Sequence, residues 1–169
     1  MFWDGFCIKN GKQLLGKYRD LAPLRIGGFS YGAQQVWELL KKGGTGRIVK
    51  VQLFSPAYFD SLSDRWKKLN LERFKQDREG YLKEFYRRAL IPPKYQNWEC
   101  LHRQEMEEEL KKLLTYRWKK IDLTGLDLEV YLGERDRIID LEGAYQFFKK
   151  LGRVYLIKGV GHSLLPEKR

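Results

Sequence analysis

The sequence predicts an α/β protein with a mostly parallel sheet, crossover helices and an inserted helical segment. Short apolar runs typical of strands alternate with stretches of helical spacing at both ends of the chain. Residues 61–120 are instead highly charged, with helical spacing and no strand-like run. Alternating strands and helices favour parallel strands joined by crossover helices. We therefore expect one core, formed by residues 1–56 and 121–169, which a helical insertion at 57–120 interrupts.

Turn signals divide the first part of the core into its elements. Strands are expected at 1–3, 22–29 and 47–54, and helices around 14–18 and over 31–42. Asp4-Gly5 ends the first strand, and Ser55-Pro56 ends the third, whose Ile, Val and Leu residues favour a β-strand. The glycine-rich residues 43–46 end the second helix. They lack the Lys-Ser/Thr ending of a phosphate-binding loop.

The remaining elements follow from the same signals. Pro92-Pro93 divides the helical insertion into two arms, because proline lacks the amide hydrogen that a helix interior requires. After the insertion, the apolar runs 126–133 and 153–157 predict two further strands, and the spacing over 141–150 predicts a helix between them.

Composition excludes several classes of protein. The chain has 169 residues, of which 43% are hydrophobic and 14% aromatic, which suits one packed domain and argues against disorder. It contains no apolar run of the roughly 18 residues that a membrane span requires, and no basic and apolar leader after Met1. We therefore expect a cytoplasmic monomer that does not bind a membrane.

Neither cysteines nor acidic residues indicate a metal site. Cys7 and Cys100 lie far apart in the sequence and have no companion cysteines, so we expect neither a disulfide framework nor a four-cysteine zinc site. The acidic run at 105–109 has no histidine at metal-ligand spacing. We expect no metal and no other cofactor.

The net charge of +11 indicates either an anionic partner or simply a basic surface. Residues 61–98 contain ten basic and five acidic side chains, interleaved with aromatic and apolar residues. This pattern predicts amphipathic helices with a charged, solvent-exposed face. The sequence contains no recognisable RNA- or DNA-binding motif, so we do not expect nucleic acid to be the partner.

Gly28-Phe29-Ser30-Tyr31-Gly32 matches G-x-S-x-G and lies between a predicted strand and a predicted helix. In this context the glycines relieve crowding in a sharp turn that presents the serine hydroxyl above the sheet. The helix N-terminus and the Tyr31 amide would favour an oxyanion developing on a bound acyl group. The alternative is an ordinary glycine-rich turn between a strand and a helix.

A serine nucleophile needs a histidine base and a carboxylate that orients the histidine. His162 follows the last predicted strand, where sites in open α/β sheets collect, whereas His102 lies in the helical insertion. Asp136 follows the penultimate strand, and Glu134 and Asp140 compete with it for the orienting role. We favour His162 as the base and Asp136 as its partner.

The sequence resembles the α/β-hydrolase family over nearly its whole length. The motifs that carry the resemblance are Gly28-Phe29-Ser30-Tyr31-Gly32, Gly133-Glu134-Arg135-Asp136 and Gly161-His162. The chain order serine, aspartate, histidine is that of the family's catalytic triad. The resemblance implies a reduced α/β-hydrolase fold in which Ser30, Asp136 and His162 are catalytic and residues 57–120 form the lid.

The resemblance also implies a second oxyanion donor. In the family, a turn of His-Gly followed by an aromatic residue supplies it, and Asp4-Gly5-Phe6 is similar to that turn. The Phe6 amide is then the expected donor. Aspartate replaces the usual histidine, no predicted strand precedes Met1, and 23 residues separate the turn from the nucleophile motif's serine.

Within the family, the compact build and charged lid are most similar to the shortened pimeloyl-[acyl-carrier protein] methyl ester esterases of biotin synthesis. This similarity implies hydrolysis of a methyl ester at the far end of a carrier-bound pimeloyl chain. Acyl carrier proteins are acidic, so the basic lid is a candidate surface for binding one. The candidate carrier contacts are Arg65, Arg73, Arg87 and Arg88, and the candidates to line the acyl channel are Phe29, Tyr31 and the lid aromatics.

Two other interpretations remain open. One is a non-catalytic carrier-binding or scaffold protein on a degenerate hydrolase fold, which Asp4 and the missing early strands would suit. The other is a generic short-chain esterase, because the same triad serves esters and thioesters of many sizes.

Overall fold

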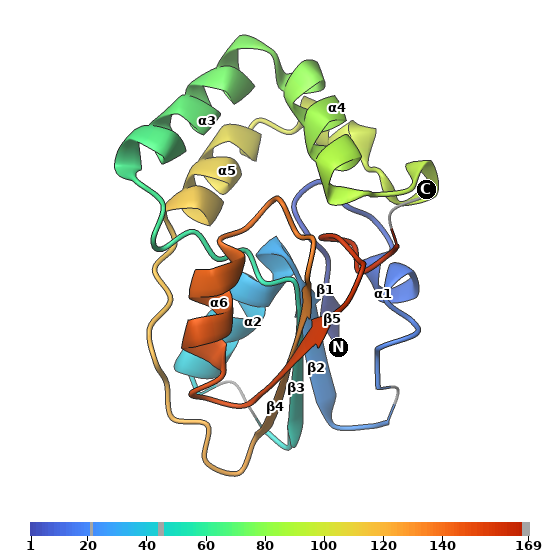
Figure 1. Cartoon of the computed structure of the whole chain (residues 1–169), viewed down its shortest axis with the longest axis vertical. Coiled ribbons are helices and arrows are strands. Elements are labelled where there is room, and N and C mark those ends of the chain that lie inside the picture. The colour runs from blue at the N-terminus through green and yellow to red at the C-terminus, as the bar shows by residue number, and fades with distance from the viewer. Residues whose placement is uncertain (21, 44–45, 167–169) are drawn as a thin grey trace.

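The computed structural model describes residues 1–20, 22–43 and 46–166, and these form a parallel five-stranded sheet with helices around it (Figure 1). The strands are β1 (Phe2–Trp3), β2 (Arg25–Phe29), β3 (Lys50–Phe54), β4 (Asp127–Gly133) and β5 (Arg153–Ile157). They lie side by side in chain order, and each neighbouring pair is parallel. The predicted α/β class with a mostly parallel sheet is confirmed. Of the predicted turn at 43–46, Gly44 and Thr45 lie outside the described residues.

Helices lie on both faces of the sheet and beyond one of its ends. They are α1 (Gly11–Leu14), α2 (Tyr31–Lys41), α3 (Asp64–Gln76), α4 (Arg78–Ala89), α5 (Met106–Thr115), α6 (Leu141–Phe148) and the 3₁₀ helices η1 (Pro93–Tyr95) and η2 (Trp98–His102). Figure 1 shows α2 and α6 on one face and α1 on the other. The fully buried rings of Trp37 and Phe148 join α2 to α6, with centroids 5.8 Å apart. No helix in the described part of the chain has the length and apolar character needed to cross a membrane.

Two strands, β2 and β3, begin three residues later than the apolar runs that predict them. β2 begins at Arg25 rather than at residue 22, because Pro23 has no amide hydrogen and Leu24 adopts a left-handed φ of 62°. β3 begins at Lys50, the residue that pairs with Arg25 in the sheet. Both strands therefore begin where regular pairing becomes possible.

The helical insertion lies beyond the carboxyl ends of the strands (Figure 1). Its helices α3, α4, η1, η2 and α5 fall within residues 57–120, and α3 packs against both α4 and α5. Because all strands of a parallel sheet end on the same side, the loops after β2, β4 and β5 meet beneath these helices. The fold thus brings three distant parts of the sequence to one place.

Cys7 and Cys100 form a disulfide, with their Cα atoms 5.7 Å apart. Our expectation that these cysteines form no disulfide is therefore wrong. Residues near the second cysteine return to the turn after β1, where the Lys9 amide donates to the Tyr95 carbonyl and the Asn97 amide to the Cys7 carbonyl. The two cysteines are 93 residues apart in the sequence, which does not indicate that they lie close together in the fold.

Two glycines allow the start of α2 to lie against the first two strands. A Cβ atom on Gly28 would lie 2.7 Å from the Ala33 amide nitrogen. A Cβ atom on Gly32 would overlap the Trp3 carbonyl oxygen and lie 2.6 Å from the Asp4 carbonyl oxygen. Both positions need glycine because the neighbouring atoms belong to backbone, which cannot rotate away.

We therefore predict that Gly32→Ala lowers the free energy of unfolding by about 1–3 kcal/mol or more, as overpacking of a well-filled site does. The gain in helix propensity, at most about 1 kcal/mol, acts in the opposite direction and is too small to offset the clash. Chemical denaturation monitored by circular dichroism measures the change.

Gly16→Ala is the matched control, because a Cβ there meets only the Gln13 carbonyl oxygen, at 3.3 Å. We expect less than half the loss of stability for this variant. Equal stabilities of Gly32→Ala and the wild type would contradict the close approach of β1 to α2.

Candidate active site

The predicted nucleophile lies in a sharp turn between β2 and α2. Ser30 has a φ of 54° and a ψ of −112°, a conformation that residues with a Cβ rarely adopt. Its amide donates to the Phe54 carbonyl at 2.9 Å, and its carbonyl accepts from the Ala33 and Ala57 amides, both at 3.1 Å. These bonds hold the strained backbone in place, so the turn fixes the position of the serine side chain.

His162 lies beside the Ser30 hydroxyl. It belongs to the loop after β5, is fully buried, and its Nε2 atom is 3.0 Å from Ser30 Oγ. The rings of Phe29 and Phe85 pack against the imidazole, with centroids 5.3 and 6.4 Å away. Gly133 at the end of β4 lets this loop approach, since a Cβ there would lie 2.7 Å from a carbonyl oxygen of the loop.

Asp136 contacts the other side of the imidazole. Its Oδ2 atom is 2.7 Å from His162 Nδ1, and both side chains are completely shielded from solvent. Its Oδ1 atom accepts hydrogen bonds from the amides of Ile138, at 2.8 Å, and Ile139, at 3.4 Å. An ionised carboxylate only accepts hydrogen bonds, so this geometry suits the tautomer with the proton on Nδ1, in which Nε2 can accept a proton from Ser30.

The residues considered as alternatives to Asp136 and His162 lie away from Ser30. The Glu134 carboxylate accepts from the Gly159 amide at 3.1 Å, and Asp140 caps α6 through the Gly143 amide at 3.0 Å. His102 is exposed in η2. Within the described residues, neither carboxylate is hydrogen-bonded to His162, and His102 is not hydrogen-bonded to Ser30.

Two backbone amides near Ser30 are free to bind an anion. Tyr31 is the first residue of α2, so no helical carbonyl is available to its amide. The Phe6 amide donates no hydrogen bond within the described chain. The turn that contains Phe6 lies against the nucleophile, since a Cβ on Gly5 would be 3.2 Å from Ser30 Cβ. The positive end of the α2 dipole adds to the attraction for an oxyanion.

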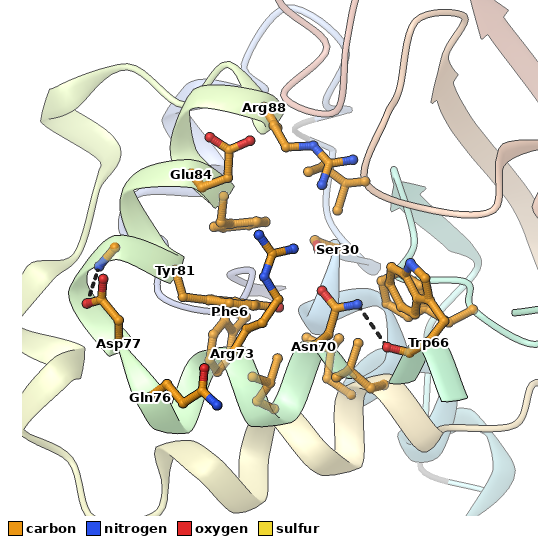
Figure 2. A pocket seen from close by; sticks show the side chains of 17 residues that line it. Phe6, Ser30, Trp66, Asn70, Arg73, Gln76, Asp77, Tyr81, Glu84 and Arg88 are labelled. Carbon is orange, nitrogen blue, oxygen red and sulfur yellow. Dashed lines mark hydrogen bonds between the residues drawn. The ribbon is translucent and has the colours of Figure 1, made fainter. Parts of the chain in front are cut away.

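A cavity of about 390 Å³ extends from Ser30 to the space between α3 and α4 (Figure 2). Its apolar lining consists of Phe6, Phe59, Trp66, Tyr81, Phe85, Leu110, Leu113, Leu114 and Ile138. Its polar lining consists of Asn70, Arg73, Gln76, Asp77, Glu84 and Arg88, all from α3 and α4 or the residue between them. This arrangement suits an apolar chain that has its reacting group at the serine and a polar continuation between the helices.

Two residues expected to line the channel do not do so. Phe29 is fully buried against His162. The Tyr31 side chain lines a separate hollow with Trp3 and Tyr116, because α2 directs it toward the end of α5 rather than toward the cavity. The Tyr31 side chain is therefore not part of the channel wall, and its backbone amide is the group that lies at the site.

The four arginines predicted to contact a carrier have different surroundings. Arg73 lines the cavity and has no ion pair within the described residues; Figure 2 shows it extending into the cavity from α3. Arg88 also lines the cavity and donates to a carbonyl of the loop after β4, at 2.6 Å. Arg87 forms a double hydrogen bond with Glu84, at 2.7 and 2.8 Å, which lowers the pKa of that carboxyl. Arg65 is exposed on α3.

The sequence did not predict the contacts between the helical insertion and the turn that contains Phe6. Tyr86 is one of the aromatic residues interleaved with the charges of residues 61–98, and its hydroxyl donates to the Cys7 carbonyl at 2.6 Å. Helical spacing predicts which face of a helix is buried and does not identify the partner. The described residues contain no cluster of three side chains that would suit a metal ion.

Solved structures resemble this chain at low sequence identity. A bromoperoxidase from Bacillus anthracis aligns with a TM-score of 0.63 at 21% identity, over 90% of this chain and 65% of that one. BioG from Haemophilus influenzae aligns with a TM-score of 0.63 at 16% identity, over 96% of this chain and 87% of that one. An esterase from Exiguobacterium antarcticum aligns with a TM-score of 0.52 at 18% identity, over 82% and 59%.

No protein-family model and no curated protein matches the sequence. The chain spans less than two thirds of the bromoperoxidase and of the esterase, but most of BioG. These alignments show a shared fold, and the identities are too low to carry over an activity. The topology, the serine turn between β2 and α2 and these alignments together show that the chain has the α/β-hydrolase fold.

Proposed function

We propose that the protein is a serine carboxylic-ester hydrolase with Ser30 as nucleophile, His162 as base and Asp136 as the orienting carboxylate. The observation that carries the proposal is the hydrogen-bonded series from Asp136 Oδ2 through the imidazole to Ser30 Oγ, with steps of 2.7 and 3.0 Å. A serine hydroxyl is a weak nucleophile at neutral pH, and an adjacent oriented base is what activates it.

In the first half of the reaction, Ser30 Oγ attacks the ester carbonyl carbon while His162 Nε2 takes the hydroxyl proton. Negative charge then develops on the carbonyl oxygen, and the Phe6 and Tyr31 amides are the donors proposed to stabilise it. Asp136 stabilises the imidazolium that forms, and the imidazolium protonates the departing alcohol. The product of this half is an ester of the acyl group with Ser30.

In the second half, His162 removes a proton from a water molecule, which attacks the acyl carbonyl carbon. The tetrahedral intermediate collapses, the Ser30 oxygen regains its proton from the imidazolium, and the free acid leaves. Each proton transfer in the proposed reaction passes through His162 Nε2, and the reaction requires no cofactor.

The proposed substrate is the methyl ester of a pimeloyl chain on acyl carrier protein, which yields pimeloyl-acyl carrier protein and methanol. The resemblance of the motifs and of the compact, charged lid to esterases of this type supports it. The cavity also supports it, because apolar residues line it beside Ser30 and arginines lie between α3 and α4. A methyl ester at the serine would then place the chain along the apolar wall and the carrier outside the lid.

An acidic carrier protein is the proposed partner. Arg65 and Arg73 have no ion pair with the described residues, so both are available to an anionic surface; Arg87 is already paired with Glu84. Complementary charges raise the rate of encounter more than the affinity, and salt screens them. A cytoplasmic monomer remains our prediction for this chain.

We predict that Ser30→Ala and His162→Ala each lower kcat at least about 10³-fold on any ester that the protein hydrolyses, because each removes an indispensable member of the proposed triad. Hydrolysis of pimeloyl-carrier methyl ester and of a p-nitrophenyl ester measures this loss. His102→Ala is the matched control and should retain full activity, since His102 lies exposed on η2.

Equal activity of Ser30→Ala and the wild type would contradict the proposed nucleophile. Absence of wild-type activity on both substrates would instead favour a non-catalytic carrier-binding protein. Activity confined to the small ester would retain the hydrolase proposal and contradict the carrier-bound substrate.

We further expect Arg73→Gln to lower kcat/KM for the carrier-bound ester about 2- to 5-fold at low ionic strength, the range of a single exposed charge pair. The p-nitrophenyl ester should be hydrolysed normally, because a small ester occupies only the serine end of the cavity. Adding salt should remove the difference between variant and wild type.

Arg47→Gln provides a charge-matched control. Arg47 is exposed and precedes β3, at the opposite end of the sheet from the lid. An identical, salt-sensitive loss in both variants would show that net charge alone matters and would contradict a specific role for Arg73.

A further inference from the structure

We propose that Tyr86, on lid helix α4, is a positioning residue that holds the Phe6 amide in its oxyanion-binding place through the Cys7 carbonyl. The inference rests on the proposed ester hydrolysis, because it assigns a residue that supports one of the two oxyanion donors. It makes α4 part of the catalytic apparatus as well as a cover over the substrate.

The contact is short and buried. Tyr86 Oη donates to the Cys7 carbonyl oxygen at 2.6 Å, whereas its alternative acceptor, the Asn97 carbonyl, is 3.3 Å away. The Asn97 amide lies 3.2 Å from the same hydroxyl and 3.1 Å from the Cys7 carbonyl. Tyr86 is 2% exposed, so water does not compete for this bond.

The Cys7 backbone needs such support because of its conformation. Cys7 has a φ of 51°, in the left-handed region that a residue with a Cβ rarely occupies. The turn that it completes is closed by a hydrogen bond from the Ile8 amide to the Gly5 carbonyl, at 3.2 Å. Strained backbone of this kind persists where its surroundings over-determine it. A fixed Cys7 carbonyl therefore fixes the direction of the Gly5-Phe6 peptide that supplies the amide.

Further attachments of this turn also come from the segment after α4. Ile8 forms a β-bridge with Gln96, in which the Lys9 amide donates to the Tyr95 carbonyl at 2.9 Å and the Asn97 amide to the Cys7 carbonyl at 3.1 Å, and Cys7 is bonded to Cys100. The β-bridge and the Tyr86 bond do not depend on the oxidation state of the cysteines. The turn and residues 86–100 thus form one connected unit.

The phenol suits this role because it remains a neutral donor. Burial raises the pKa of Tyr86 to about 12, so its proton is retained over the range in which an ester hydrolase works. The ring packs edge-on against Trp98, with centroids 5.1 Å apart. Phenylalanine at this position would keep the ring contacts and remove only the hydroxyl.

The test compares Tyr86→Phe with the wild type on the preferred ester. We expect kcat to fall about 10-fold with KM within about 2-fold, because a displaced oxyanion donor weakens the transition state and leaves ground-state binding intact; complete removal of a donor costs about 10²–10³-fold. Tyr116→Phe is the matched control. Its hydroxyl donates to Glu38 at 2.7 Å, away from the turn, and its kcat should stay within about 2-fold of wild type.

A second measurement separates positioning from loss of stability. An alkylboronic acid binds when Ser30 Oγ bonds to boron and its proton passes to His162, which leaves a tetrahedral, negatively charged boron. Tyr86→Phe should weaken this inhibitor by the same factor as kcat/KM, while the carboxylic acid product binds as to wild type. Thermal unfolding of both tyrosine variants should give similar small decreases in Tm.

The possible failures are distinguishable. Wild-type kcat and boronic acid affinity in Tyr86→Phe, with Ser30→Ala inactive, would overturn the positioning role and leave the hydrolase proposal intact. Equal weakening of the boronic acid and of the product acid would also overturn it, since a general loss of structure would explain both. Full activity of Ser30→Ala would overturn the hydrolase proposal and this inference with it.

Discussion

The backbone at Ser30 has a φ of 54°, and contacts with the neighbouring strands restrain it in that conformation. The bond from its amide to Phe54 ties the turn to β3, and the close approach of Gly32 to the Trp3 carbonyl places the start of α2 against β1. Because the strain is held by backbone atoms, the turn fixes the position of Ser30 Cβ and the direction in which the side chain leaves the backbone. The loops after β4 and β5 then place Asp136 and His162 beside this serine.

Parallel topology explains why three motifs that are far apart in the sequence lie together in the structure. Ser30, Asp136 and His162 each follow a strand, and parallel strands deliver the residues after them to one edge of the sheet. Strand and helix spacing, with glycine at the turns, therefore predicted both the α/β class and which residues would meet. Strand boundaries were less predictable, because the start of β2 depends on the conformation of Leu24.

Contacts within and beneath the insertion could not be predicted in the same way. Nothing in the spacing of Cys7 and Cys100, or of Tyr86 and Cys7, indicates that the segment after α4 returns to the turn after β1. Such contacts depend on how helices pack, which the periodicity of each helix leaves open. The side chain of Tyr31 illustrates the same gap, since sequence adjacency to the nucleophile did not place it in the cavity.

The central claim is that His162 activates Ser30 as a nucleophile, and covalent labelling tests it most directly. A p-nitrophenyl alkylphosphonate transfers its phosphonyl group to an activated serine and releases p-nitrophenolate, and mass spectrometry of the digested protein identifies the modified residue. We predict one phosphonyl group per chain on Ser30 and no labelling in His162→Ala. An unlabelled wild-type protein, or a label on another residue, would contradict the account.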